Sequence, residues 1–134
     1  MIPFRWASRV YWEDTDGAGI VYYANYLRFL ERARTEWLRS LGYSQRVLAE
    51  EPGIVFAVVS LNIEYRKPAK LDDELIITCL PQPEGAATVI YAQQIHEAHN
   101  LLAEASVRVA CLDARTLRPK RLPDFLGPGA LLNG

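Results

Sequence analysis

One segment of this chain has a helical hydrophobic period, and an acidic, glycine-containing loop leads directly into it. Its apolar stripe, at spacings of three and four, consists of Tyr26, Leu30, Ala33, Trp37 and Leu41, widened by Leu27 and Leu38. We predict a helix that begins near residues 23–25, with Asn25 as its N-cap and Gly42 at its C-terminal cap. So broad a stripe indicates a helix that other elements wrap.

The other patterned segments alternate at period two, which is typical of strands. They predict strands over residues 4–12, 54–65, 74–80, 88–97 and 101–113, a short helix or loop over 43–53, and a turn over 81–85. This order indicates one α+β domain over residues 1–134, in which a mainly antiparallel sheet of about five strands packs on one helix. We expect residues 127–134 to be a mobile tail.

One sheet of this size cannot both cover so broad a helix and shield its own edge. Dimerisation by pairing of edge strands would solve both problems, so the sequence favours a homo-oligomer.

Charge, cysteine content and hydropathy weigh against several classes of protein. Fifteen basic against 16 acidic residues give a formal net charge of −1, which disfavours nucleic-acid binding. Cys79 and Cys111 form no CxxC pair, so a metal site or a disulfide framework has little support. No signal-peptide core and no stretch of about 20 apolar residues is present, which predicts a cytoplasmic protein without a membrane span.

The acidic loop holds the candidate catalytic groups. The Asp16 carboxylate is suited to attack an acyl carbon or to draw a proton from water. Gly17 and Gly19 permit close approach, and N–H groups at a helix start stabilise an oxyanion. The alternative is that Asp16 only forms a turn. Glu13, read as the continuation of the strand, and Asp14, read as support for the loop, compete with it, and residue types alone do not rank the three.

Aromatic and basic side chains suggest binding surfaces. The candidates for a ligand cavity, or for ordinary core, are Tyr22, Tyr23 and Tyr26. Three basic residues could hold the phosphates of a nucleotide-bearing substrate, or could simply form a solvated surface: Arg66, Lys67 and Lys70. A second basic cluster, with the same two interpretations, consists of Arg115, Arg118, Lys120 and Arg121. The two histidines, His96 and His99, lie far along the sequence from the loop, which counts against a hydratase.

Residues 13–27 (Glu-Asp-Thr-Asp-Gly-Ala-Gly-Ile-Val-Tyr-Tyr-Ala-Asn-Tyr-Leu) and 31–36 (Glu-Arg-Ala-Arg-Thr-Glu) closely resemble the hot-dog acyl-CoA thioesterases. The resemblance is strongest to the Tol-Pal-associated (YbgC-type) branch, related to 4-hydroxybenzoyl-CoA thioesterase, and it continues through residues 65–73. It implies a long helix wrapped by an antiparallel sheet in a homodimer or homotetramer. It also implies hydrolysis of an acyl-CoA or acyl carrier protein thioester, without a metal or organic cofactor.

The family motif assigns roles to residues of the loop and the helix start. The second Asp of its Asp-x-Asp carries catalysis and corresponds to Asp16; the N–H that polarises the thioester carbonyl corresponds to that of Tyr23. The resemblance further implies an acyl pocket shaped by Tyr22, Tyr26 and the partner subunit. The YbgC-type branch usually has histidine where this chain has Tyr23, so the backbone role survives but an imidazole role does not. A non-catalytic module that binds or scaffolds an acyl carrier protein is the competing class.

Overall fold

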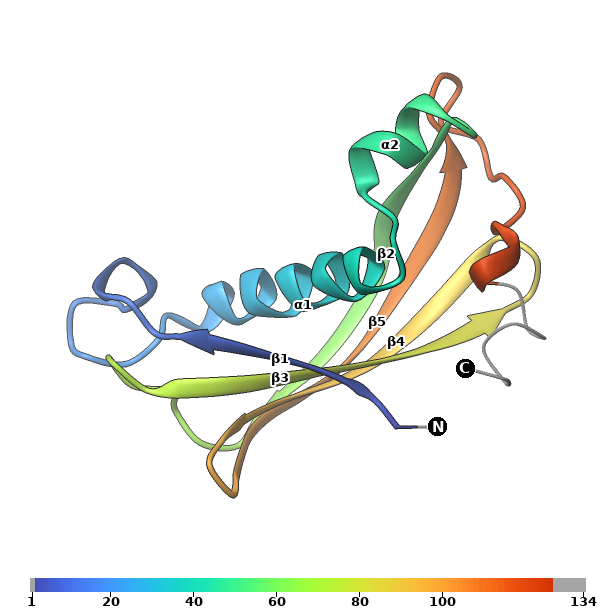
Figure 1. Ribbon diagram of the computed structural model, residues 1–134. Helices are drawn as coiled ribbons and strands as arrows, with labels where there is room; N and C mark the ends of the chain where they lie inside the picture. The colour runs from blue at the N-terminus through green and yellow to red at the C-terminus, as the bar shows by residue number, and fades with distance from the viewer. Residues whose placement is uncertain (1, 127–134) are drawn as a thin grey trace.

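The computed structural model describes residues 2–126 and has one antiparallel sheet with one long helix, α1 (Figure 1). The strands are β1 (Phe4–Arg9), β2 (Ile54–Tyr65), β3 (Glu74–Glu84), β4 (Thr88–Glu97) and β5 (Asn100–Asp113); the helices are α1 (Tyr26–Ser40) and α2 (Gln45–Glu50). The five strands lie in the order β1-β3-β4-β5-β2. The predicted α+β class and the sheet of about five strands are confirmed, whereas the predicted tail, residues 127–134, lies outside the described part of the chain.

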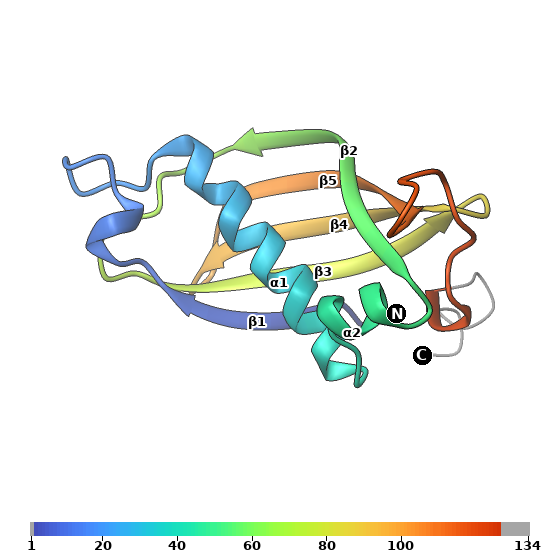
Figure 2. The same ribbon diagram turned by 90° about the horizontal axis from the view of Figure 1, so that it is seen from above.

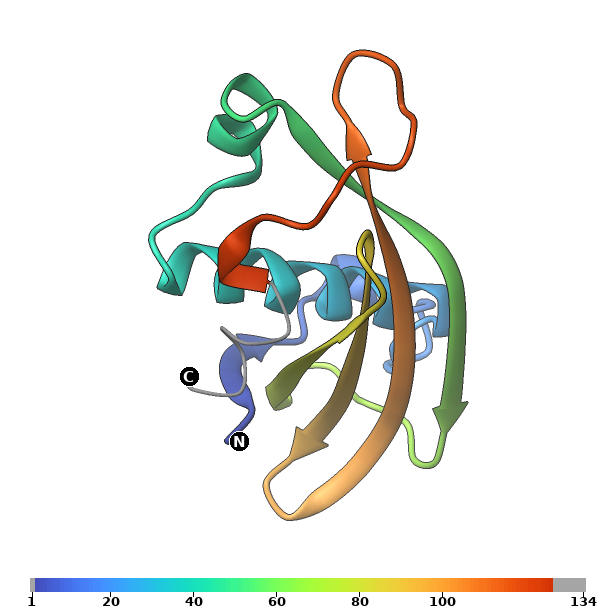
Figure 3. The same ribbon diagram turned by 90° about the vertical axis from the view of Figure 1, so that its right-hand side faces the viewer.

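Helix α1 crosses the concave face of the sheet, which curves around it (Figures 2 and 3). Its buried stripe consists of Tyr26, Phe29, Leu30, Ala33, Trp37 and Leu38. The predicted stripe was wrong at two positions, because Leu27 and Leu41 are 38% and 44% exposed, and it omitted Phe29, which is 1% exposed. The sheet lies against the Phe29 side of the helix and leaves the Leu27 side open.

The end of α1 confirms the predicted glycine cap. Gly42 has φ +90°, and its N–H donates to the Arg39 carbonyl over 2.9 Å. The Tyr43 N–H donates to the Leu38 carbonyl over 3.0 Å, which closes a Schellman-type cap. The chain then turns into α2, so a short helix is present in the segment where a short helix or loop was expected.

The first strand is shorter than predicted. β1 ends at Arg9, and Trp12–Asp14 form a 3₁₀ turn in which the Asp14 carboxylate accepts the Tyr11 N–H over 2.9 Å. Trp12 is therefore 64% exposed instead of buried on a strand face, and Glu13 does not continue the strand. Alternation alone could not show this, because the side chain of Asp14 ends the strand by bonding the backbone.

The third strand is longer than predicted and includes two prolines from the expected turn. Pro81 pairs with Tyr91, and Pro83 pairs with Val89 of β4. On the other side, the pairing of β3 with β1 stops at Cys79. Proline lacks the N–H that a further neighbour would need, so this uncovered end of β3 accommodates both residues.

The two edges of the sheet differ in character. β1 has six residues and carries Arg5 and Arg9, features that discourage further pairing. β2 has 12 residues, and Val58, Val59 and Leu61 are 52%, 56% and 39% exposed. We call these three residues the β2 edge. Among residues 2–126 no helix is long and apolar enough to cross a membrane, and the cytoplasmic location stays a prediction.

Candidate active site

The acidic loop is a short, internally hydrogen-bonded hairpin. The Asp16 N–H donates to the Ile20 carbonyl over 2.9 Å, and Asp16 Oδ1 accepts the Ala18 N–H over 2.7 Å. Gly17 and Gly19 have φ values of +88° and +91°, which side chains other than glycine rarely adopt. Asp16 is exposed, and its Oδ2 has no hydrogen-bond partner within the described chain. The carboxylate is therefore presented to solvent by a defined backbone.

Asp14 is buried beneath this loop, and its carbonyl accepts two hydrogen bonds. One comes from the Tyr22 N–H over 3.1 Å, and the other comes from the Asn25 side-chain amide over 2.9 Å. Asp14 supports the loop, as one of the alternatives held. Asn25 occupies the position before α1, but its side chain does not cap the helix. It bonds back to the loop instead.

The helix start offers unpaired donors beside the loop. Residues 23–25 form a 3₁₀ turn in which the Asn25 N–H donates to the Tyr22 carbonyl over 2.8 Å. The Tyr65 hydroxyl, from the end of β2, donates to the Tyr23 carbonyl over 2.9 Å. The N–H groups of Tyr23 and Ala24 have no acceptor within residues 2–126. These free N–H groups at the positive end of the helix can stabilise negative charge on a substrate oxygen.

Tyr26 is a structural anchor for the neighbouring segment. Its buried hydroxyl accepts the Ala69 N–H over 2.9 Å, and the Val21 N–H donates to the Ala69 carbonyl over 2.8 Å. Burial raises the pKa of Tyr26 above its usual value, so the phenol stays neutral. The rings of Tyr26 and Tyr65 meet edge to face at 5.1 Å.

A cavity of about 270 Å³ opens beside this aromatic group. Its lining consists of Val21, Tyr23, Tyr26, Tyr65, Arg66, Lys67 and Pro68. Four of the predicted site residues, Tyr23, Tyr26, Arg66 and Lys67, therefore meet in one hollow. Tyr22, Lys70 and Asp16 do not line it.

The three predicted phosphate-binding cations differ in their surroundings. Arg66 pairs with Glu64 over 3.0 Å and with Glu104 over 3.2 Å, so its charge is balanced. Lys67 Nζ donates to Asn100 Oδ1 over 3.3 Å and pairs with no carboxylate within residues 2–126. Lys70 forms no ion pair within the part of the chain described here. The two lysines are thus better placed than Arg66 to hold a phosphate.

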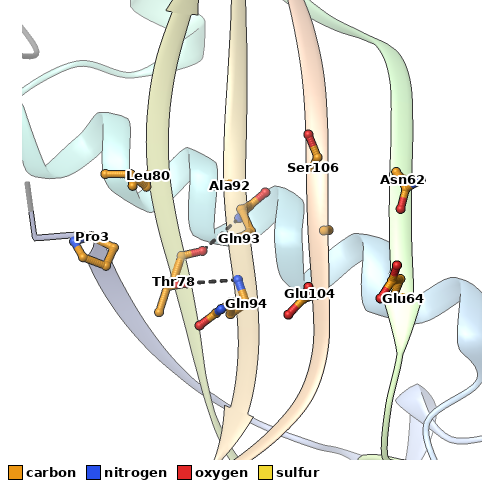
Figure 4. Close-up of a pocket in the computed structure, with 11 residues that line it drawn as sticks. Pro3, Asn62, Glu64, Thr78, Leu80, Ala92, Gln93, Gln94, Glu104 and Ser106 are labelled. Carbon is orange, nitrogen blue, oxygen red and sulfur yellow. Dashed lines mark hydrogen bonds between the residues drawn. The ribbon is translucent and has the colours of Figure 1, made fainter.

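A second hollow, of about 390 Å³, lies on the outer face of the sheet and contains none of the predicted site residues (Figure 4). His96 is hydrogen-bonded to Gln94, and both cysteines are buried. No group of three or more His, Cys, Asp or Glu side chains within residues 2–126 is arranged to hold a metal. The absence of a cofactor requirement stays a prediction.

Sequence reasoning missed two residues that shape the helix start. Asn25 was assigned to helix capping, and Tyr65 was read only as a strand residue. The sequence shows that both side chains can form hydrogen bonds. It does not show that Asn25 bonds to Asp14 and Tyr65 bonds to Tyr23, because each bond depends on how the loop, helix and strand meet.

Comparisons with known proteins agree with this arrangement. A sequence model of the thioesterase-like superfamily matches residues 10–128. The acyl-CoA thioesterase YbgC of Haemophilus influenzae is 42% identical over 120 residues, covering 90% of this chain and 88% of that protein. The acyl-CoA thioester hydrolase YbgC of Escherichia coli is 45% identical over 121 residues, covering 90% of each.

Solved structures give the same result for the fold. A probable thioesterase from Bartonella henselae superposes with a TM-score of 0.86 at 34% identity, covering 91% of this chain and all of that one (100%). The 1,4-dihydroxy-2-naphthoyl-CoA thioesterase Slr0204 from Synechocystis superposes with a TM-score of 0.83 at 27% identity, covering 91% of this chain and 90% of that one. The loop, the helix and the wrapped sheet are thus those of the hot-dog fold, and the chain belongs to the thioesterase-like superfamily.

Proposed function

We propose that the chain is an acyl-CoA thioesterase, which hydrolyses an acyl thioester to the free acid and the thiol. One observation carries this proposal: the Asp14 carbonyl is bonded to both Tyr22 and Asn25. This links the loop that presents Asp16 to the turn whose N–H groups are free. A carboxylate and oxyanion donors in one linked unit are what acyl transfer to water requires. The names of the YbgC relatives support the acyl-CoA substrate.

In the reaction, the Tyr23 N–H donates to the thioester oxygen as negative charge develops on it. Asp16 acts in one of two ways. As nucleophile, its carboxylate attacks the carbonyl carbon, the C–S bond breaks, the thiolate takes a proton from solvent, and water hydrolyses the resulting anhydride. As general base, it takes a proton from water, the hydroxide attacks the same carbon, and the C–S bond breaks as the thiolate is protonated. Removing one oxyanion donor costs about 10²–10³ in kcat in comparable sites.

Binding of the substrate is assigned to the residues around the smaller cavity. Tyr23 and Tyr26 contribute the aromatic side of the cavity, and Tyr22, whose ring lies 4.9 Å from that of Tyr23, extends this aromatic surface beyond the lining. Lys67, which lines the cavity, and Lys70, which lies outside it, bind phosphate groups of coenzyme A or of an acyl carrier protein. Arg66 contributes less, because two carboxylates already neutralise it.

The protein is proposed to act as a homodimer that pairs through β2. β2 is long, its β2 edge residues are apolar and exposed, and within residues 2–126 it pairs only with β5, whereas β1 is short and charged. Pairing two copies of β2 would satisfy its open backbone groups and bury Val58, Val59 and Leu61. Two such dimers would form the tetramer that the resemblance implies.

The test is kcat and KM against a panel of acyl-CoA chain lengths and aromatic acyl groups, for the parent and for Asp16→Asn. The variant keeps the side-chain shape and removes the carboxylate, so kcat should fall by at least about 10² on every substrate. Glu13→Gln is the matched control, because Glu13 is also exposed beside the loop and should retain full activity.

Three outcomes are informative. Full activity of Asp16→Asn would refute the mechanism. No turnover by the parent, together with stoichiometric binding of an acyl carrier protein, would support the non-catalytic scaffold; consumption of an enoyl-CoA would indicate a hydratase.

Single turnover in ¹⁸O-water separates the two roles of Asp16, since label enters its carboxyl group only if an anhydride forms.

A further inference from the structure

We infer that Asn25 is a positioning residue for the reaction: its side-chain amide fixes the oxyanion donor of the helix start relative to the catalytic carboxylate. This inference rests on the proposed function and assigns a role to a residue that would touch neither the substrate nor the reacting atoms.

The Asn25 side chain bridges a stretch of the sequence between the helix start and the acidic loop. Its Nδ2 donates over 2.9 Å to the carbonyl of Asp14, 11 residues earlier. Asp14 lies only two positions before Asp16, and the intervening Thr15 is held to Val21 in a β-bridge. The Asn25 side chain therefore ties the helix end of the site directly to the carboxylate end.

Asn25 also holds the peptide group that carries the oxyanion donor. The Tyr23 N–H and the Tyr22 carbonyl belong to one peptide plane. That carbonyl accepts the Asn25 N–H over 2.8 Å, while the Tyr22 N–H donates to Asp14 over 3.1 Å. Asn25 thus fixes the plane through its backbone and the loop through its side chain. A hydrogen bond to the carbonyl also polarises the N–H at the other end of the peptide.

Asparagine is the residue type that suits this hydrogen bond. A carbonyl acceptor requires a donor, and a short, stiff amide supplies one. Asp has the same shape but donates only when it is protonated, and Ala removes the link. Misplacement of reacting groups by about 1 Å costs about 10²-fold in rate. We therefore expect loss of this link to lower kcat by about 10- to 100-fold, with KM changed less than about threefold.

The experiment compares Asn25→Ala and Asn25→Asp with the parent, with Gln45→Ala as the matched control. Gln45 is exposed on α2, beyond the opposite end of α1 from the site, and its side-chain amide also donates one hydrogen bond, to Thr35 over 3.1 Å, so its loss should leave kcat unchanged. In Asn25→Asp, kcat relative to the parent should rise as the pH falls, because protonation of the introduced carboxyl group restores a donor. A residue that only stabilises the fold would not give this pH-dependent rescue.

Comparison of the two single variants with the double variant Asp16→Asn/Asn25→Ala distinguishes failure of the positioning role from failure of the proposed function. If Asn25 acts through the same site, the double variant should be no slower than Asp16→Asn alone. An inactive Asp16→Asn beside a fully active Asn25→Ala overturns the positioning role and leaves the proposed function intact. A fully active Asp16→Asn overturns the proposed function itself. Equal losses of kcat for Asn25→Ala and Asn25→Asp at every pH would also overturn the inference.

Discussion

A buried glutamine in the middle of the sheet joins α1 to two strands, and its loss should be costly. Gln93 is 1% exposed, and its Oε1 accepts Arg34 Nη1 over 3.0 Å. Its Nε2 donates to the carbonyls of Leu30 over 3.0 Å and of Thr78 over 3.3 Å. Arg34 also lies over the Tyr91 ring at 5.9 Å, and burial lowers the pKa of its guanidinium.

The substitution Gln93→Leu nearly conserves the side-chain volume and removes all three hydrogen bonds. A hydrogen bond to a charged group contributes about 1.5–3 kcal/mol, and a neutral one about 1 kcal/mol. Because burial of the apolar leucine side chain recovers part of this energy, we expect the free energy of unfolding to fall by about 2–4 kcal/mol. At this chain length that lowers Tm by roughly 8–16 °C.

The control is the next residue. Gln94 is exposed on the opposite face of the strand, as Figure 4 shows, where its side chain contacts only His96 among the described hydrogen bonds. Gln94→Leu should change the free energy of unfolding by less than about 0.5 kcal/mol. Both variants are measured by urea unfolding at one protein concentration, because dimerisation would make stability concentration-dependent.

A double-mutant cycle with Arg34→Met tests the cause. In the parent, Gln93→Leu leaves the partly buried Arg34 cation without its hydrogen-bond acceptor. Arg34→Met removes this cation, so in that background Gln93→Leu should lower the free energy of unfolding by at least about 1 kcal/mol less. A loss of less than about 0.5 kcal/mol in the free energy of unfolding for Gln93→Leu alone, or simple additivity of the two variants, would contradict this role of Gln93.

Two further predictions concern the sheet edge and a buried thiol. Val59→Lys should lower the mass measured by light scattering toward that of one 15.2 kDa chain, whereas Ala7→Lys on β1 should not; an unchanged mass for Val59→Lys contradicts pairing through β2. Burial raises the pKa of Cys79 to about 12 from its usual 9.0, so the folded state holds a proton that the unfolded state loses above pH 9. The free energy of unfolding should therefore fall between about pH 9 and pH 12 by up to ~1.4 kcal/mol per pH unit, and this slope should be smaller in Cys79→Ala.

The sequence was sufficient for the elements whose signal is local. The helix end at Gly42 and the limits of β2 and β4 follow from glycine, proline and alternation. Local signals failed where a partner decides the structure. Phe29 is buried and Leu27 exposed only because the sheet lies to one side of α1. Pro81 is tolerated only because β1 does not extend that far.

The candidate site shows the same division. The acidic loop and the helix start were identified from residue types together with the resemblance, and the roles of Asp16 and the Tyr23 N–H stay predictions. The bonds from Asn25 to Asp14 and from Tyr65 to Tyr23 join residues far apart in the sequence. Neither follows from any pattern within one element.

The order of the strands also bears on how the molecule assembles. β3, β4 and β5 follow one another in the chain and in the sheet, so short connections bring them together at little entropic cost. β1 and β2 dock on opposite edges of this meander, and the acidic loop and α1 lie between them in the chain. Both ends of the segment that carries the candidate site are therefore held only after two long-range pairings have formed. We expect the loop and the helix start to acquire their final arrangement late in folding, so that a nascent chain would fold its sheet before it could hydrolyse a thioester.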